Sequence, residues 1–132
     1  MGEGRGPMAK GRTFLVVDDN EDNRILASYA LRKAFPGANI FEAHLIDDAL
    51  RLARELHPDA ILTDHHLSVD YGTHFVENLA AEGVTCPVVM VTASLDPAVH
   101  QRAYSAGAAH VFAGPDFDFI SYLQDALGPD QR

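Results

Sequence analysis

The sequence predicts an α/β fold in which one open parallel sheet is covered by helices on both faces. Short runs of β-type residues alternate five times with segments of helical periodicity, as they do in chains built from successive βα units. Three of the runs are continuously apolar, which is typical of parallel strands buried on both faces. With 132 residues, 47% of them hydrophobic, the chain has the length and composition of one such domain.

The five expected strands are residues 13–18, 39–43, 60–63, 87–92 and 109–113. The second helix has the clearest pattern, because apolar residues follow the i, i+3, i+4, i+7 spacing of one helix face at Ala49, Leu52, Ala53 and Leu56. Apolar stripes mark the first helix at Ile25, Leu26, Tyr29, Ala30 and Ala34, the third at Phe75, Val76, Leu79 and Ala80, and the last at Ile120, Leu123 and Leu127.

Cap and breaker residues agree with these elements. Asp96-Pro97 predicts the start of the fourth helix, Gly107 its end, and Pro58 the end of the second. A disordered N-terminal tail is expected over residues 1–12, one domain over 13–128 and a short tail over 129–132. Because the last helix ends close to the end of the chain, no output domain is expected.

Composition limits the partners and the compartment. The net charge of −9 argues against direct binding to nucleic acid or to anionic membranes, since both need clustered Lys and Arg. The longest apolar run, residues 88–91, is too short to span a membrane, and no secretory signal is recognised. The one cysteine, Cys86, excludes an internal disulfide and fits a reducing compartment, so a cytoplasmic location is expected.

Polar residues follow three of the expected strands at the point where each ends. Asp18 and Asp19 end the first strand, Asp64 follows the third, and Thr92 ends the fourth. In a doubly wound sheet these carboxyl ends line the crevice where ligands bind. Three carboxylates in one crevice would repel one another without a cation, and Mg²⁺ accepts such ligands. Asp19 and Asp64 are therefore candidate direct ligands, and Asp18 a ligand through water.

A carboxylate beside Mg²⁺ can attack phosphorus and form an acyl phosphate. In that reaction Thr92 could donate its hydroxyl proton to a phosphoryl oxygen, and Ala93 leaves room for the group to enter. An acidic pair alone is more often part of a solvated surface. The interpretation as a site depends on the three strand ends meeting at one edge of the sheet.

These motifs resemble the receiver domain of two-component response regulators over residues 13–127. The segments that carry the resemblance are 14–20 with the acidic pair and Asn23-Arg24 after it, 57–64 leading to Asp64, Gly72, 86–93 with Thr92, and 106–108 with Pro115. The resemblance implies a flavodoxin-like (βα)₅ sheet of strand order 2-1-3-4-5. It also implies a signalling switch that is not an enzyme beyond its own phosphorylation and dephosphorylation.

In this family a sensor histidine kinase, a phosphotransfer protein or a small acyl phosphate donates the phosphoryl group to the aspartate, here Asp64. Mg²⁺ is bound by the counterparts of Asp19 and Asp64 and by a backbone carbonyl, here that of His66. The fourth helix, fifth strand and fifth helix form the usual surface for an output partner or a second copy. On this chain that surface would include five residues: Tyr104, His110, Phe112, Phe119 and Tyr122.

Three positions depart from the family pattern. Gly114 stands where a lysine usually contacts the phosphoryl group, Val111 at the aromatic switch position, and Ser68 in place of the usual proline. Losing a preorganised donor to a developing anion costs about 10²–10³ in rate, so slow phosphorylation is expected. One hypothesis is that His66 or His110 replaces the missing donor.

Other functions stay open at the level of sequence. Gly114 favours a pseudo-receiver that binds partners without phosphate, whereas the intact acidic residues and Thr92 oppose it. A Mg²⁺-dependent phosphohydrolase would need a second carboxylate two residues after Asp64, where this chain has His66. A transition-metal site at His65, His66 and His74 lacks a recognised ligand spacing and is disfavoured.

Overall fold

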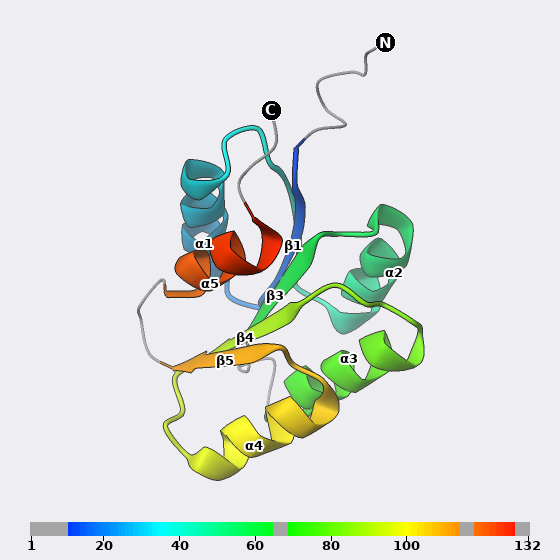
Figure 1. Ribbon diagram of the computed structural model, residues 1–132. Helices are drawn as coiled ribbons and strands as arrows, with labels where there is room; N and C mark the ends of the chain where they lie inside the picture. Colours follow the sequence, from blue (N-terminus) through cyan, green and yellow to red (C-terminus); the bar gives the residue numbers. More distant parts are fainter. Residues whose placement is uncertain (1–10, 65–68, 114–117, 129–132) are drawn as a thin grey trace.

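The computed structural model describes residues 11–64, 69–113 and 118–128, and it contains an open five-stranded parallel sheet (Figure 1). The strands are β1 (Thr13–Val17), β2 (Asn39–Ala43), β3 (Ala60–Asp64), β4 (Val88–Thr92) and β5 (His110–Ala113). They lie in the order β2-β1-β3-β4-β5, and each neighbouring pair is parallel. The expected fold class and strand order are confirmed, with strand ends that differ from expectation by one residue at most.

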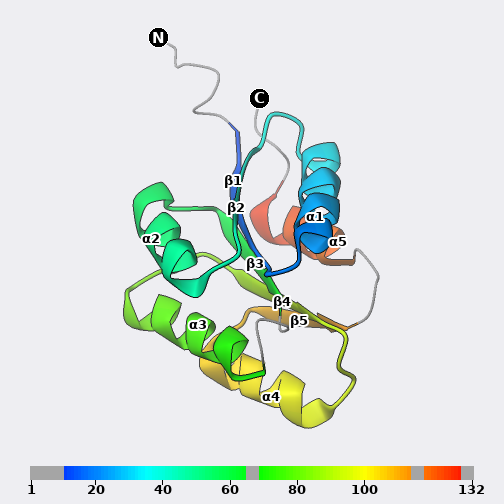
Figure 2. The same ribbon diagram turned by 180° about the vertical axis from the view of Figure 1, so that it is seen from behind.

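Within the described residues, five helices cover the sheet. They are α1 (Glu21–Ala34), α2 (Ile46–Leu56), α3 (Val69–Ala81), α4 (Pro97–Ala106) and α5 (Asp118–Leu127). Helices α1 and α5 lie together on one face, and α2, α3 and α4 cover the other, as Figures 1 and 2 show from opposite sides. Of the tails expected over residues 1–12 and 129–132, residues 1–10 and 129–132 lie outside the described residues. Arg12 is described, and its backbone carbonyl accepts a hydrogen bond from the N–H of Asn39 at 2.7 Å.

The sheet separates two apolar cores, because alternate strand residues point to opposite faces. Leu15, Val17 and Ile61 face α2, α3 and α4, where Phe75 of α3 is among the largest fully buried side chains. On the other face, Phe14 packs against Phe35 beyond the end of α1, with ring centroids 4.9 Å apart. Strands buried on both faces explain the continuous apolar runs of the sequence.

The apolar stripe expected on α1 is only partly buried. Ile25, Leu26 and Tyr29 are 53%, 55% and 61% exposed, whereas Ser28 and Leu31 face the sheet. The spacing of apolar residues predicted the wrong buried face of α1 because Ser28, a polar residue, is buried. Its hydroxyl donates to the Glu42 carboxylate, a contact that apolar spacing cannot reveal.

Helix ends follow the expected chemistry. Asn20 caps α1 by accepting from the backbone N–H of Asn23 at 3.0 Å, and Asp96 caps α4 by accepting from Ala98 at 3.0 Å. Gly107 ends α4 with φ of 121°, a conformation that L side chains rarely adopt. The capped start of α1 fixes the turn that follows β1, where the acidic pair lies.

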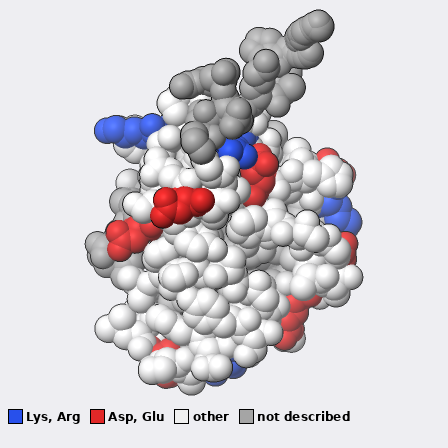
Figure 3. Space-filling model, in the orientation of Figure 1, with Lys and Arg blue, Asp and Glu red and all other residues white. Residues whose placement is uncertain are grey.

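Surface charge is dispersed on the face drawn in Figure 3, where Lys and Arg of the described residues stand apart from one another. Isolated cations do not form the continuous basic surface that nucleic-acid binding uses. Among the described residues, no helix combines the length and apolar character required to cross a membrane.

Candidate functional site

Three carboxylates meet at the carboxyl edge of the sheet. Asp18 follows β1, Asp64 is the last residue of β3, and Asp19 continues the chain from Asp18. One carboxylate oxygen from each lies within 4.8 Å of the other two. Asp18 and Asp64 are each 7% exposed and Asp19 is exposed, so the cluster opens to solvent on the Asp19 side.

Strand pairing brings these residues together. Val17 of β1 pairs with Thr63 of β3, and therefore the residue after each of them reaches the same edge of the sheet. The backbone N–H of Asp18 also donates to the carbonyl of Ala43, at the end of β2, at 3.1 Å. The sequence could indicate which residues end strands, but only the parallel register places them side by side.

Burial is the largest influence on the pKa of Asp18, which lies beside Asp64. Burial and the neighbouring Asp64 carboxyl together raise this pKa from 3.8 to about 6, against hydrogen bonds from Asn20 and Asn23 that lower it. The Asn20 N–H donates to Asp18 Oδ1 at 2.8 Å. Asp64 Oδ2 is buried and has no hydrogen-bond partner among the described residues. The cluster thus holds more negative charge than its own donors satisfy.

This arrangement fits a hard divalent cation. Mg²⁺ prefers carboxylate oxygens and keeps several waters, and the three converging oxygens with an exposed side offer both. A cation there would satisfy Asp64 Oδ2 and offset the repulsion that raises the Asp18 pKa. The backbone carbonyl of His66, expected as a further ligand, lies outside the described residues.

Thr92 lies at the same edge, as the last residue of β4. Its partner in β5 is Ala113, and its side chain is buried. Thr92 Oγ1 accepts a hydrogen bond from the backbone N–H of Ser94 at 3.1 Å. Because that bond uses only a lone pair, the hydroxyl proton remains available to an incoming oxygen atom.

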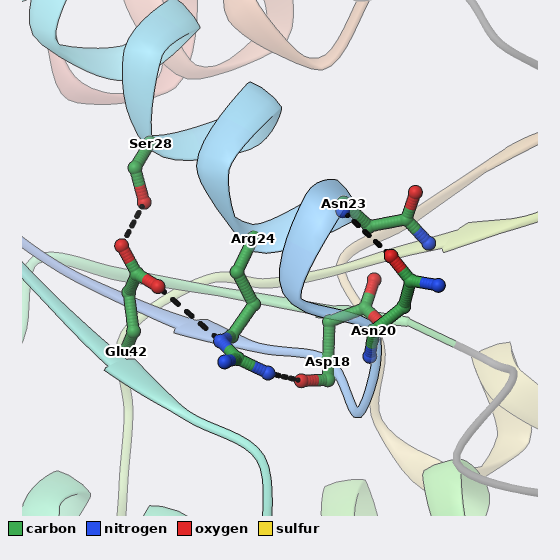
Figure 4. A network of polar contacts seen from close by, with 6 residues as sticks. All are labelled: Asp18, Asn20, Asn23, Arg24, Ser28 and Glu42. Atoms are coloured by element: carbon green, nitrogen blue, oxygen red, sulfur yellow. Dashed lines mark hydrogen bonds and ion pairs between the residues drawn. The ribbon is translucent and has the colours of Figure 1, made fainter.

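A polar network behind the acidic pair was not recognised from the sequence. Arg24 of α1 donates from Nη1 to the backbone carbonyl of Asp18 at 2.8 Å and from Nε to Glu42 Oε1 of β2 at 3.2 Å (Figure 4). Ser28 donates to the second Glu42 oxygen at 3.0 Å. Asn23-Arg24 contributed to the resemblance, but the partner Glu42 is far away in sequence.

Comparison with known proteins settles the family. Residues 14–116 match the family model of the response regulator receiver domain. The chain belongs to this family. Receivers are signalling domains.

Curated relatives are identical to this receiver at about a third of the aligned residues. The glycerol metabolism activator of Pseudomonas putida is 33% identical over 96 residues, which are 72% of this chain and 43% of that protein. The two-component response regulator ORR41 of Oryza sativa subsp. japonica is 32% identical over 96 residues, 71% of this chain and 76% of ORR41. The match to PhoB of Escherichia coli is 32% identical and covers 79% of this chain and 45% of PhoB. The receiver thus spans less than half of two of these relatives.

Solved structures show the same fold. A response regulator from Chloroflexus aurantiacus superposes with a TM-score of 0.79 at 26% identity and covers 91% of this chain and all of its own (100%). Chemotaxis response regulator CheY4 of Vibrio cholerae superposes with a TM-score of 0.73 at 25% identity, covering 89% of this chain and 96% of its own.

His110 is poorly placed to replace the lysine that the family usually has at the position of Gly114. Gly114, which stands at the lysine position, lies outside the described residues, as do His66 and Ser68. His110 begins β5 and pairs with Val89, three residues before Thr92 on β4, so it lies about 10 Å along the strands from the carboxyl edge. Its ring instead stacks against Phe112 and Tyr122, at centroid distances of 4.4 and 5.1 Å. This geometry disfavours His110 as a phosphoryl donor contact.

The expected partner surface is aromatic but smaller than the sequence indicated. Tyr104 is 43% exposed, and His110, Phe112 and Tyr122 are partly exposed beside it. Phe119 is 2% exposed and belongs to the core between α5 and the sheet. Its inclusion among surface residues was therefore wrong, because α5 turns Phe119 and Leu123, four residues apart, toward β1 and β3.

His74, the one described member of the proposed histidine group, is exposed on α3. Its Nδ1 lies 3.3 Å from Glu77 Oε1, one helical turn away. His65 and His66 lie outside the described residues. Within the described ranges, the cluster of potential ligands from three or more residues is that of Asp18, Asp19 and Asp64.

Proposed function

We propose that this receiver accepts a phosphoryl group on Asp64 in a Mg²⁺-dependent reaction in the cytoplasm. The donor would be the phosphohistidine of a sensor kinase or phosphotransfer protein, or a small acyl phosphate. One observation carries the proposal: Asp64 Oδ2 is buried without a hydrogen-bond partner among the described residues, beside two further carboxylates. Because no described donor occupies this oxygen, its lone pairs are available to a cation or to phosphorus.

Each residue has a defined part in this reaction. A carboxylate oxygen of Asp64 forms a bond to phosphorus while the bond from phosphorus to the donor breaks, and the donor nitrogen or carboxylate oxygen keeps the electron pair. Asp18, Asp19 and Asp64 would hold the cation, which supplies charge neutralisation for the phosphoryl oxygens. Thr92 donates its hydroxyl proton to a phosphoryl oxygen, which draws it away from Ser94.

The response is proposed to reach the face formed by α4, β5 and α5. Thr92 ends β4, and the turn after it leads into α4 through two further hydrogen bonds. Ser94 Oγ accepts from Asp96 N at 3.1 Å, and the Ser94 carbonyl lies 2.8 Å from His100 Nε2. A movement of Thr92 toward a phosphoryl group would disturb these contacts and so shift α4, the helix that carries Tyr104. The output partner would bind that face, or a second copy of the chain would.

The test is incubation with Mg²⁺ and acetyl phosphate, followed by intact-mass analysis and amide NMR with beryllofluoride. We expect a mass gain of one phosphoryl group that EDTA prevents. Asp64→Asn should abolish the gain, whereas Asp47→Asn, which removes an exposed carboxylate from α2, should leave it unchanged. Labelling that persists in Asp64→Asn would refute the assignment, and continuous release of phosphate would indicate a hydrolase instead.

A pseudo-receiver that works without phosphate remains the second candidate, because Gly114 replaces the usual lysine. Gly114→Lys separates the two. A slow but phosphorylatable receiver should be labelled about 10²–10³ times faster by acetyl phosphate when the cation is restored. A pseudo-receiver should show no labelling in the natural chain and no beryllofluoride-dependent shifts at Thr92.

A further inference from the structure

Arg24 joins three elements at the back of the acidic cluster. It lies on α1, its side chain is only 15% exposed, and its guanidinium contacts both the end of β1 and the edge strand β2. Nη1 donates to the Asp18 carbonyl at 2.8 Å, and Nε donates to Glu42 Oε1 at 3.2 Å (Figure 4). The planar guanidinium can serve both acceptors at once because its donors point in fixed directions.

Glu42 is itself held in place. Ser28, one helical turn after Arg24, donates to Glu42 Oε2 at 3.0 Å, and only 1% of Ser28 is exposed. Both carboxylate oxygens of Glu42 therefore have a donor on the same face of α1. The Glu42 side chain is 33% exposed, so its position is favoured mainly because any other would leave the buried Ser28 hydroxyl without this acceptor.

The Asp18 carbonyl is rigidly connected to Asp19. The carbonyl of Asp18 and the N–H of Asp19 share one planar peptide unit, so a donor that fixes the oxygen also fixes the Cα of Asp19. Asp18 has other restraints, because its N–H binds the Ala43 carbonyl and its Oδ1 accepts from Asn20. The exposed Asp19 carboxylate makes no hydrogen bond within the described part of the chain. The position of the Asp19 carboxylate in the cluster therefore depends on the orientation of the Asp18–Asp19 peptide plane.

We infer that Arg24 is a positioning residue for the cation site, which it supports by fixing the Asp18–Asp19 peptide and hence the Asp19 carboxylate. The inference rests on the metal-binding part of the proposed function. It assigns to Glu42 and Ser28 the task of holding the guanidinium. Groups behind a ligand that orient it typically change metal affinity by 10–100-fold when they are removed.

The experiment is a Mg²⁺ titration of the full chain without phosphodonor, followed by calorimetry and by the amide NMR shifts of residues 18–20. Arg24→Ala should weaken Mg²⁺ binding about tenfold or more. Arg24→Lys keeps the charge but not the planar pair of donors, so its affinity should lie between those of the natural chain and Arg24→Ala. The matched control is Arg54→Ala, which removes an ion pair of 2.9 Å between α2 and Glu82. We expect it to leave the affinity unchanged.

A double-mutant cycle separates positioning from general loss of stability. If Arg24 acts through Asp19, Arg24→Ala should weaken Mg²⁺ binding much less in an Asp19→Asn background than in the natural chain. A purely structural role for the Arg24–Glu42 pair would instead give the same loss in both backgrounds, and that result would overturn the inference.

The outcomes distinguish this inference from the proposed function. If the natural chain binds Mg²⁺ and Arg24→Ala binds it equally well, the inference fails and the proposed function stands. If the natural chain does not bind Mg²⁺, the metal part of the proposed function fails and the inference fails with it. Should Arg24→Ala not fold, Arg24→Lys and Ser28→Ala carry the test, and natural affinity in both would refute the role of Arg24.

Discussion

The phenol hydroxyl of Tyr104 on α4 accepts a hydrogen bond of 3.1 Å from the backbone N–H of Val111 on β5. Strand β5 lies at the edge of the sheet, and no other strand of the described residues lies beside the N–H groups on its outer side. The hydroxyl therefore serves as the acceptor that a sixth strand would provide, and it links α4 to the strand beneath it.

Tyr104→Phe should lower the free energy of unfolding by about 1 kcal/mol, because it leaves the Val111 N–H without its acceptor. Urea unfolding measures the loss, and faster hydrogen exchange at the Val111 amide locates it. Tyr29→Phe is the matched control, since Tyr29 is 61% exposed and its ring contact with Lys33 survives the change. Equal losses in the two variants would argue against the bond.

Asp18 should destabilise the metal-free protein as pH rises. Its pKa is raised to about 6 in the folded state from an ordinary value of 3.8, so the folded state holds the proton more tightly and stability falls between those two values. Asp18→Asn cannot ionise. Its stability relative to the natural chain should therefore increase by about 2 kcal/mol between pH 4 and pH 7.5.

This comparison is made by urea unfolding in EDTA, with Asp47→Asn as a control for the loss of one exposed negative charge. A stability difference between Asp18→Asn and the natural chain that stays constant with pH would show that burial does not perturb Asp18.

His57→Gly should stabilise the fold. His57 ends α2 in the left-handed region, with φ of 49° and ψ of 61°, where a Cβ is unfavourable. The side chain is exposed, so its removal costs little packing. A gain of about 0.5–1 kcal/mol is expected in urea unfolding. His57→Ala keeps the Cβ and should bring no such gain; if both variants gain equally, the backbone explanation is wrong.

Cys86 should react slowly with alkylating reagents. Burial raises the pKa of its thiol from 9.0 to about 11, which lowers the thiolate fraction at pH 8 by about a hundredfold. The rate of iodoacetamide modification, followed by mass, should still rise with pH above 10 in the folded protein. A rate that levels off near pH 9 would contradict the raised pKa.

The sequence predicted the fold well because the relevant signals are local. Runs such as 88–91 are apolar on both faces, and helix ends carry their own chemistry at Asp96 and Gly107. The sequence was less reliable about which face of a helix is buried. Ile25, Leu26 and Tyr29 were predicted to face the core and are exposed. Phe119 was predicted to lie on a partner surface and is buried.

For the site, the residues that end strands are recognisable in the chain alone: the acidic pair after β1, Asp64 in β3 and Thr92 in β4. A residue's position at a strand end is readable from the chain because apolar runs stop abruptly there. The chain alone does not reveal that three of these side chains converge within 4.8 Å, or that Asp64 Oδ2 has no hydrogen-bond partner among the described residues. The tertiary structure decided these features, and also that Arg24 meets Glu42 behind them. Such contacts join residues far apart in sequence, and they arise from the register of parallel strands and the packing of α1 on the sheet.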